Sequence, residues 1–304
     1  MYIENKGSAQ YLVKKVSGKK IAVNISHVTA PSVVSIEELS RKEFEFLSNQ
    51  QRYKEFKNDL YNPEILDEVF SESIFLSNII NNHLLPNDVL NQKYQAFAIR
   101  FIYESNKTEG SRIPLEAVEQ IIQQKKYVYK IKNEIIEVEN SLRAWEFVNK
   151  KFIFNRANIK KLYHILTTGL LQESGQKYPR GFKKVPIVVN NTTTTSPENV
   201  DREVESLLQD YKIHTKVTNQ LKQAFDFHLR FEQIHPFENG NGRTGRFLLN
   251  KILLANGLLP MIVFEANRQS YFNAIHSALS GNKKKYYTFM LEQYQKTLSE
   301  YWKR

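Results

Sequence analysis

The sequence predicts a mainly helical protein with a small β-hairpin near its N-terminus and a second, exposed hairpin in the middle of the chain. Apolar residues recur at helical spacing in most segments after Ser35. Two β-rich stretches, "QYLVKKV" and "IAVNISHV", flank a Ser-Gly-Lys-Lys turn within residues 9–35. In "KKVPIVVNN", Val185, Ile187 and Val189 fall on one face, which is typical of a short strand.

The helical pattern begins with Ser35 and Glu38, which can form a capping box, and continues through "PEILDEVFSESIFLSNIINNHL". "YQAFAIRFIYESNKTEG" predicts a helix that ends near Gly110. A second helix is expected after Pro114. Apolar residues also recur at helical spacing in "IIEVENSLRAWEFVNKKF" and in "NIKKLYHILTTGLL", which predicts two further helices.

Three more helices are predicted in the second half of the chain. Ser196 and Pro197 supply an N-cap and a first-turn proline for one of them. "NQLKQAFDFHLRFEQI" has the spacing of a second helix. The third runs from Thr244 to Asn256 and is closed by Gly257.

Composition limits the class of protein. The chain has 304 residues, of which 41% are hydrophobic and 25% charged, as in an ordinary globular protein. It contains no cysteine, which excludes disulfides, thiolate nucleophiles and cysteine-based zinc sites. No apolar run has the length of a membrane span, and the N-terminus lacks the apolar core of a signal peptide. We therefore expect a cytoplasmic protein without a membrane partner.

The net charge of +11 favours partners that carry phosphate, either a nucleotide or a nucleic acid. The basic residues are scattered, and the densest cluster, Lys283–Lys285, is short. We therefore do not expect nucleic acid to be the main partner.

The stretch "HPFENGNGRTGR", residues 235–246, contains the pattern G-x-G-x-x-G. A dinucleotide-binding fold requires a strand before these glycines, but a helical pattern precedes them here. A phosphate-binding P-loop requires Lys-Ser/Thr where Arg246-Phe247 stands. Both interpretations are rejected.

The remaining interpretation is helix, loop, helix. Pro236 ends the first helix, and glycines 240 and 242 let the backbone turn its N–H groups toward the N-terminus of the second. Arg243 and Arg246 are three residues apart, so they share a helical side and can reach the same polyphosphate. His235 lies across this loop, where it can act as a general base.

These residues resemble a known family. The run His235-Pro236-Phe237-x-x-Gly240-Asn241-Gly242-Arg243-x-x-Arg246 is similar to the signature H-P-F-x-[D/E]-G-N-G-R-x-x-R of Fic proteins. "FHLRFEQIHPF" resembles the helix that leads into the motif, and "NRQSYFNAIHSAL" the later segment beside the adenine pocket. "KKVPIVV" lies where Fic proteins carry a β-hairpin flap. The resemblance covers roughly residues 95–295 and implies a Fic-type helical bundle.

The resemblance implies a protein adenylyltransferase, which moves AMP from ATP to a Ser, Thr or Tyr hydroxyl of a target protein. His235 would take the proton from that hydroxyl. The amides around Gly240, Asn241 and Gly242 would hold the phosphates, Arg243 would bind the polyphosphate and Arg246 the γ-phosphate. The flap would align a target segment by adding a strand to its edge, and its residues are Lys184, Val185, Pro186, Ile187 and Val188.

One position departs from the family pattern. Fic proteins use Asp or Glu before the first glycine of the motif to hold Mg²⁺, and this chain has Asn239 there. Its neutral carbonyl oxygen can still bind Mg²⁺ or Mn²⁺, but with less charge attraction. Weak metal affinity, an altered metal preference and slow turnover are all consistent with this change.

A second motif lies upstream. "SNKTEG", residues 105–110, resembles the [S/T]-x-x-x-E-[G/N] inhibitory motif of many Fic proteins, on a helix expected at about residues 96–110. A carboxylate at Glu109 can pair with Arg246 and so occupy the space that the γ-phosphate needs. The sequence therefore predicts an autoinhibited enzyme.

The domain boundary is expected between residues 94 and 95, with a β/helical region at 1–94 and the Fic-like catalytic domain at 95–304. The N-terminal region could select the target protein, form the interface of a homodimer, or only complete the fold. Tyr271 is a candidate for stacking on adenine, whereas His228 is expected to be packed structure. No metal-ligand spacing connects the other histidines considered, which are His164, His214 and His276.

Three other functions remain open from the sequence. The same site can remove AMP from a modified protein if Glu109 orients a water molecule, as in some family members that carry the inhibitory glutamate. Asn239 is also consistent with a non-catalytic nucleotide-binding module. The net charge of +11 leaves a DNA-associated regulator as the third alternative.

Overall fold

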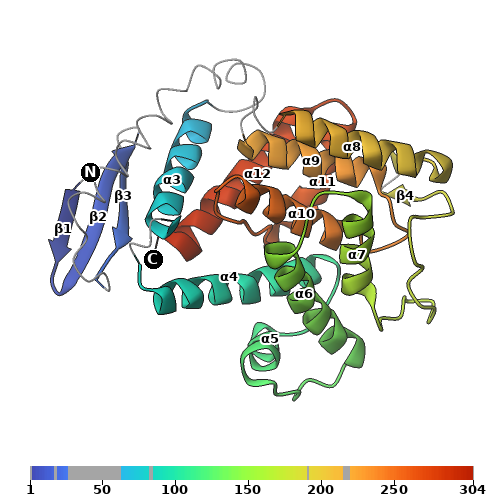
Figure 1. Cartoon of the computed structure of the whole chain (residues 1–304), viewed down its shortest axis with the longest axis horizontal. Helices are drawn as coiled ribbons and strands as arrows, with labels where there is room; N and C mark the ends of the chain where they lie inside the picture. The colour runs from blue at the N-terminus through green and yellow to red at the C-terminus, as the bar shows by residue number, and fades with distance from the viewer. Residues whose placement is uncertain are drawn as a thin grey trace.

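The computed structural model describes residues 2–16, 19–26, 63–81, 85–189, 192–214 and 220–303. Within them the chain is mainly helical, as predicted (Figure 1). The α-helices are α3 (Pro63–Asn81), α4 (Asn87–Thr108), α5 (Leu115–Glu119), α6 (Lys132–Lys150), α7 (Arg156–Thr167), α8 (Val200–His214), α9 (Gln220–Ile234), α10 (Asn241–Ala255), α11 (Arg268–Leu279) and α12 (Lys283–Thr297). Short helical turns, η1 to η4, cover Gln120–Gln124, Pro197–Asn199, Glu265–Asn267 and Leu298–Trp302.

The N-terminal sheet has three antiparallel strands in the order β1 (Tyr2–Lys6), β2 (Ala9–Val16), β3 (Lys19–Asn24). The predicted hairpin corresponds to β2 and β3, in which Leu12 pairs with Val23. Strand β1 was not predicted, because its residues are mostly exposed and show no apolar alternation. It pairs with β2 through its backbone instead, after a turn at Gly7.

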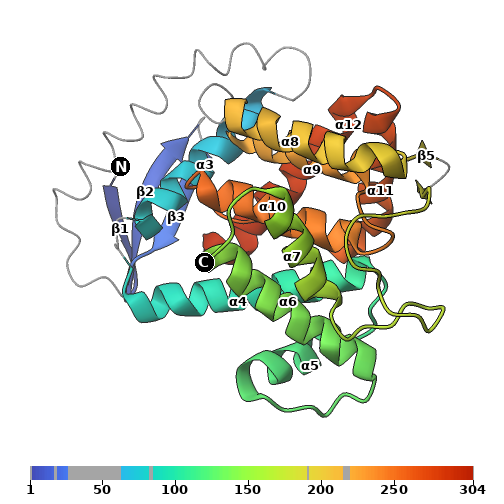
Figure 2. The same cartoon turned by 45° about the vertical axis from the view of Figure 1, so that its right-hand side comes forward.

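The helices form a bundle around α10. Helix α10 packs against α9, α6, α7 and α4, and α11 and α12 pack against each other beside this group (Figure 2). The apolar stripe of α10 is buried on every side that faces these neighbours, with Phe247, Leu248 and Ile252 fully covered. Because α10 carries the second half of the glycine-rich motif, this part of the motif lies on a largely buried helix.

One continuous core joins the bundle to the N-terminal elements. Phe97 on α4 contacts Trp145 on α6 and Trp302 at the C-terminal end, with ring centroids 5.6 and 5.4 Å apart. Phe101, one helical turn later, contacts Phe247 at 4.8 Å. The same apolar cluster includes residues of α3 and of β2. Helix α4 runs without a break through the expected boundary at residues 94 and 95.

The second hairpin consists of β4 (Val188–Val189) and β5 (Thr192–Thr193), and we call residues 184–194 the flap. Its exposure was predicted, but its first strand is shorter than the apolar alternation suggested. Pro186 lacks the N–H that a ladder requires, and the strand begins only after it. The flap lies beside α11, far from the N-terminal sheet (Figure 2).

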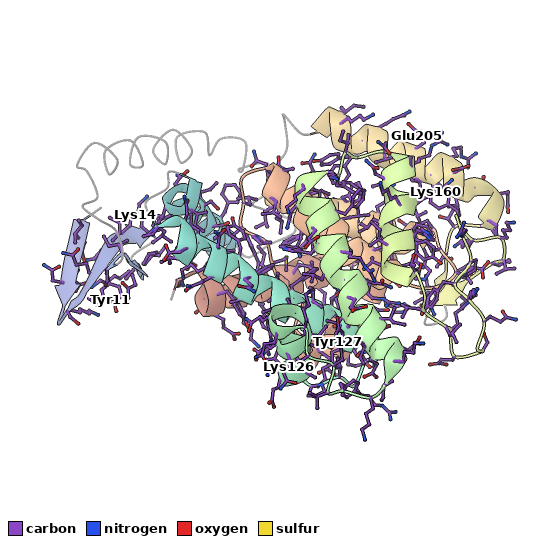
Figure 3. All side chains as sticks on the ribbon, turned by 60° about the horizontal axis from the view of Figure 1, so that its bottom comes forward. Tyr11, Lys14, Lys126, Tyr127, Lys160 and Glu205 are labelled. Atoms are coloured by element: carbon purple, nitrogen blue, oxygen red, sulfur yellow. The ribbon has the colours of Figure 1, made fainter. Side chains whose placement is uncertain are left out.

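Side chains at the two ends of the molecule are widely separated. Tyr11 and Lys14 project from β2 at one end, whereas Lys160 on α7 and Glu205 on α8 lie at the other (Figure 3). Tyr127 lies in the loop after η1, where its hydroxyl donates to Glu139 at 2.8 Å. Within the described residues, no helix has both the length and the apolar character needed to cross a bilayer.

Two local predictions need comment. The expected capping box at Ser35 and Glu38 lies outside the described residues. Helix α10 begins at Asn241, three residues before the predicted start at Thr244. The Asn241 side chain explains the difference, because it accepts from the Phe237 N–H at 2.9 Å and donates to the Phe237 carbonyl at 2.8 Å. This brace lets the helix start inside the glycine-rich motif.

Candidate active site

A cavity of about 240 Å³ lies between the flap, the end of α4, the start of α10 and helix α11. His235, Glu109 and Gly242 face it from the motif side. The flap contributes Val189 and residues 192–194, rather than the predicted docking residues. Those predicted residues, Lys184, Val185, Pro186, Ile187 and Val188, are exposed except for Ile187, which is partly buried. Part of the flap therefore lines the cavity, and part of it is exposed to solvent.

The loop that carries His235 is held in a strained conformation. His235 has a φ of 50°, a region that residues other than glycine seldom adopt. Its N–H still completes the last turn of α9 by donating to the Phe231 carbonyl at 2.9 Å. The ring of Phe237 stacks on Tyr163 with centroids 3.9 Å apart and fixes the next part of the loop. Such strain persists only where the surroundings support it, and it is common at functional sites.

His235 is neutral at pH 7. Burial first, and then the positive charge of Lys183, lower the pKa of His235 to about 4, although Glu109 acts in the opposite direction. An unprotonated imidazole is the form that accepts a proton from a hydroxyl. The side chain is partly buried and lines the cavity, so a hydroxyl that enters the cavity can reach it.

The first turn of α10 forms the floor of the site. Gly240 precedes it with a φ of 80°, which a side chain would disfavour. Gly242 has helical backbone angles, and glycine is needed there because a side chain would not fit. A Cβ at this position would lie 2.4 Å from Glu109 Oε1 and 3.0 Å from Arg246 Nη1. The first N–H groups of a helix lack helical partners, and the helix dipole favours negative charge there. The predicted phosphate-binding amides of Gly240, Asn241 and Gly242 thus belong to this helix start.

Arg246 is buried and bonds to residues of α4 and its C-terminal end through Nε and Nη2, whereas its Nη1 has no hydrogen-bond partner within the described residues. Its Nη2 donates to Glu109 Oε1 at 2.8 Å and to the Ser105 carbonyl at 2.9 Å, and its Nε donates to Ser105 Oγ at 3.0 Å. Burial alone would raise the pKa of Glu109, but the charges of Arg246 and Arg243 together lower it below its usual value. Glu109 is therefore an ionised partner of Arg246, at the end of the helix on which it was expected.

Arg243 points to a different glutamate. Its Nη1 donates to Glu137 Oε1 on α6 at 2.8 Å, and its Nη2 lies 3.5 Å from the Tyr178 hydroxyl. Both arginine and glutamate line a second, polar cavity of about 510 Å³. Glu109 lines both cavities and so lies between them. The two arginines of the motif are each paired with a carboxylate from another helix.

Asn239 directs its carbonyl oxygen into its own loop, where Oδ1 accepts from the Gly240 N–H at 2.6 Å. Its side chain is exposed beside the polar cavity. Within the described ranges, no group of three His, Asp or Glu residues is arranged to hold a metal ion. Asn239 is the residue that the resemblance assigned to the metal, and its Oδ1 is engaged within the loop instead.

His228 belongs to the packed interior. Burial lowers the pKa of His228 to about 3, so its ring is neutral. Tyr286 donates its hydroxyl hydrogen to the Phe225 carbonyl at 3.1 Å and therefore accepts from His228 Nδ1 at 2.9 Å. His228 Nε2 then accepts from the Tyr271 hydroxyl, also at 2.9 Å. This network holds Tyr271, which is 1% exposed, with its ring at the wall of the cavity.

Glu232 was not singled out by the sequence. It lines the same cavity, its side chain is 10% exposed, and burial raises its pKa to about 8. Its Oε1 lies 3.7 Å from His228 Nε2. Because both groups are neutral at pH 7, this contact is not an ion pair.

Three comparisons place this site among known proteins. Residues 153–253 match the model of the Fic/DOC family, and this segment includes the flap, the His235 loop and α10. This segment is similar to the Fic/DOC family. The chain is homologous to protein adenylyltransferases at low identity.

Two of these relatives show the range of sequence identity and coverage. A probable protein adenylyltransferase of Aquifex aeolicus is 34% identical over 146 residues, which are 46% of this chain and 41% of that protein. The protein adenylyltransferase Fic of Nematostella vectensis is 23% identical over 267 residues, which are 84% of this chain and 59% of that protein. The chain thus spans less than two thirds of the length of either relative.

Solved structures share the fold of this chain over much of its length. Fic-1 from C. elegans superposes with a TM-score of 0.66 at 20% identity, covering 78% of this chain and 70% of that one. A Fic domain-containing signaling protein from Bacteroides thetaiotaomicron superposes with a TM-score of 0.62 at 19% identity, covering 78% and 92%. The predicted mainly helical Fic fold is confirmed.

The sequence missed the partners that these side chains meet. Glu137 and Lys183 lie 106 and 52 positions before Arg243 and His235, in segments that have no motif of their own. A glutamate on a helix and a lysine in "FKKV" have the composition of solvent-exposed positions. Only the packing of α6 and of the flap against the motif shows that Lys183 is buried and that Glu137 is partly buried.

Proposed function

We propose that this chain is a protein adenylyltransferase that transfers AMP from ATP to a hydroxyl group of a target protein, and that Glu109 inhibits it. The observation that carries the proposal is the ion pair between Glu109 and Arg246, at 2.8 Å, in the wall of the cavity that His235 also lines. The names of the curated relatives support the reaction type.

In the proposed reaction, His235 accepts the proton of the target hydroxyl through a ring nitrogen. The hydroxyl oxygen attacks the α-phosphorus of ATP and forms the new phosphorus–oxygen bond. The bond between the α-phosphorus and its bridging oxygen to the β-phosphate breaks, and pyrophosphate leaves. The helix start at Gly240–Gly242 would stabilise the negative charge on the phosphates through N–H groups and the helix dipole.

Glu109 would inhibit the reaction because its carboxylate pairs with the Arg246 guanidinium that would otherwise bind the terminal phosphate. Nε and Nη2 of Arg246 already donate to Ser105 and Glu109, so a terminal phosphate would be left with Nη1, which has no hydrogen-bond partner within the described residues. The ionised carboxylate would also repel a polyphosphate in the same space. Removing this carboxylate should therefore favour the binding geometry in which the α-phosphate faces His235.

The proposal is tested by label transfer from ATP that is labelled in its α-phosphate, with Mg²⁺ or Mn²⁺ present. We expect protein-bound label from the Glu109→Gly and Glu109→Gln variants to exceed that of the wild type by at least about tenfold, which corresponds to about 1.4 kcal/mol. Adding His235→Ala should abolish the label, because no base then takes the proton.

Glu119→Gly is a matched control, since Glu119 is an exposed glutamate on α5 away from the cavity. Its labelling should equal that of the wild type. If folded Glu109→Gly protein binds ATP but yields no label with either metal, the transferase function is wrong and a nucleotide-binding module is favoured.

Removal of AMP is a second candidate, because Glu109 and His235 line one cavity and a carboxylate can orient a water molecule there. Labelled Glu109→Gly protein provides a substrate for this test. Unlabelled wild-type protein should release AMP from it if the site removes AMP, whereas unlabelled Glu109→Gln protein should not. Equal release by both proteins would contradict a role for the carboxylate.

A further inference from the structure

Lys183 is a buried lysine at the base of the flap. It is 3% exposed, although it stands one residue before the segment that the sequence assigned to target docking. Its Nζ donates to Thr194 Oγ1 at 2.6 Å and to the Ile234 carbonyl at 3.2 Å. Its backbone N–H donates to the Pro236 carbonyl at 2.8 Å. One residue thus joins the outgoing and returning arms of the flap to the His235 loop.

The returning arm is fixed through Thr194. Its hydroxyl accepts from Lys183 and donates to the Ile187 carbonyl at 2.7 Å, while its N–H approaches the same carbonyl at 3.3 Å. These bonds close the base of the flap, because Ile187 precedes β4 and Thr194 follows β5. Each arm is therefore tied to Lys183, directly by the chain on one side and through Thr194 on the other.

The two remaining bonds of Lys183 bracket His235. They go to the carbonyls of Ile234 and Pro236, the residues immediately before and after it. His235 has a positive φ, so its backbone needs support from its neighbours to stay in place. Hydrogen bonds to both flanking peptides supply that support. The same side chain and backbone thus hold the flap and the catalytic histidine in one fixed relation.

Charge adds a second effect. Within the described part of the chain, no carboxylate forms an ion pair with Lys183, and burial lowers the pKa of its ammonium to about 8. The positive charge of Lys183 lowers the pKa of His235 further, after the larger effect of burial. The other titratable groups that line the cavity with His235 are Glu109 from α4, Glu232 from α9, Tyr271 from α11 and His276 from α11.

We propose that Lys183 is a positioning residue for the transfer reaction, which fixes the flap to the His235 loop and so sets where a target hydroxyl meets the base. This inference rests on the proposed function for its catalytic meaning, but the tether itself is a property of the fold. Lys183 touches neither substrate nor reacting atoms in this role. It acts through the flap and through His235.

The test compares Lys183→Met with Lys183→Arg, each in the Glu109→Gly background. Methionine keeps the apolar stem and removes the charge and donors, whereas arginine keeps both. Amide hydrogen exchange of the flap should be faster by about tenfold or more in Lys183→Met, since the closing bonds are lost. The His235 ring, followed by NMR and assigned from a His235→Asn spectrum, should titrate at a higher pH than in the parent. Both changes should be smaller in Lys183→Arg.

The pH profile of self-labelling supplies the activity readout. The acid limb of the rate in Lys183→Met should shift to higher pH by about one unit, together with His235, which a merely structural residue would not cause. Lys150→Met, at an exposed lysine on α6, is the matched control and should leave all three readouts unchanged.

Thr194→Val is the second variant if Lys183→Met does not fold, because it removes the hydroxyl that accepts from Lys183 and donates to the Ile187 carbonyl and leaves the Lys183 charge in place. It should also accelerate flap exchange. A folded variant with unchanged flap exchange and an unchanged His235 titration overturns the inference. Exchange and titration need no catalysis, so if they change as expected while no variant self-labels, the tether stands and the transferase function fails.

Discussion

Single residues of this site have properties that their neighbours impose. Burial and nearby charge keep His235 and His228 neutral, keep Glu109 ionised beside Arg246, and keep Glu232 protonated. Glu109 and Glu232 line the same cavity, yet they carry opposite protonation states at pH 7. The difference follows from the guanidinium that Glu109 contacts and Glu232 does not.

Glu232 makes folding stability depend on pH. Its pKa is about 8 in the folded chain and near 4.5 when exposed, so between these values the folded state keeps a proton that the unfolded state releases. The free energy of unfolding must therefore fall as pH rises through this window. Glu232→Gln cannot ionise and should flatten the dependence, measured by urea unfolding between pH 6.5 and 8.

This window avoids His228, whose lowered pKa makes stability fall only as pH drops below about 6.5. Glu119→Gln, at an exposed site, serves as the control and should keep the wild-type slope. The same slope in Glu232→Gln as in the wild type would contradict a buried, protonated Glu232.

At the scale of elements, the close contact of α9 with α10 explains the last glycine of the motif. A Cβ at Gly245 would lie 2.5 Å from Glu232 Oε1 and 3.2 Å from Phe231 Cδ1, both on α9. The sequence predicts phosphate binding by the amides of Gly240 and Gly242 and predicts no role for Gly245. The structure gives them separate tasks: Gly240 makes the turn, Gly242 leaves space at the cavity, and Gly245 allows helix packing.

Gly245→Ala should therefore destabilise the fold by about 1–3 kcal/mol through overpacking. Helix propensity alone would predict a gain of about 1 kcal/mol, so the sign distinguishes the two effects. Urea unfolding measures the change, and Ser270→Ala at an exposed position of α11 is the reference. A stabilised Gly245→Ala protein would show that α9 and α10 have room to separate.

At the scale of the whole molecule, the N-terminal elements and the C-terminal end share one core. Glu72 on α3, which is 1% exposed, forms an ion pair with Lys303. The neighbouring Ser73 makes a hydrogen bond with Tyr294 on α12. Helix α4 then runs without interruption from Asn87 to Thr108 and is followed by Glu109. Residues before the segment that matches the Fic/DOC family thus pack in the same core as that segment.

Removing one member of the buried pair should cost more than removing both. Lys303→Met leaves the Glu72 carboxylate buried without this cation and should lower the free energy of unfolding by on the order of 2 kcal/mol. Adding Glu72→Leu should restore most of the loss, since an apolar pair has no charge to desolvate. Unfolding of the single and double variants measures this coupling. Additive losses in the double variant would argue against the pair.

The sequence by itself predicted helices α3 to α10 and both hairpins, because each depends on residues close together in the chain, whereas helices α11 and α12 were not predicted. Periodicity marks the apolar face of α10, and Pro236 and Gly240 fix the loop locally. It also pointed to Glu109 as the partner of Arg246, through resemblance rather than through spacing.

Only the tertiary structure decided which other side chains meet the motif. Glu137 reaches Arg243 across 106 positions, and Lys183 reaches the His235 loop from the base of the flap. Strand β1 and the early start of α10 likewise depend on backbone and side-chain bonds formed on folding. Such contacts arise from the packing of whole elements, and the local pattern of apolar and polar residues does not encode which distant charge will be brought to the site.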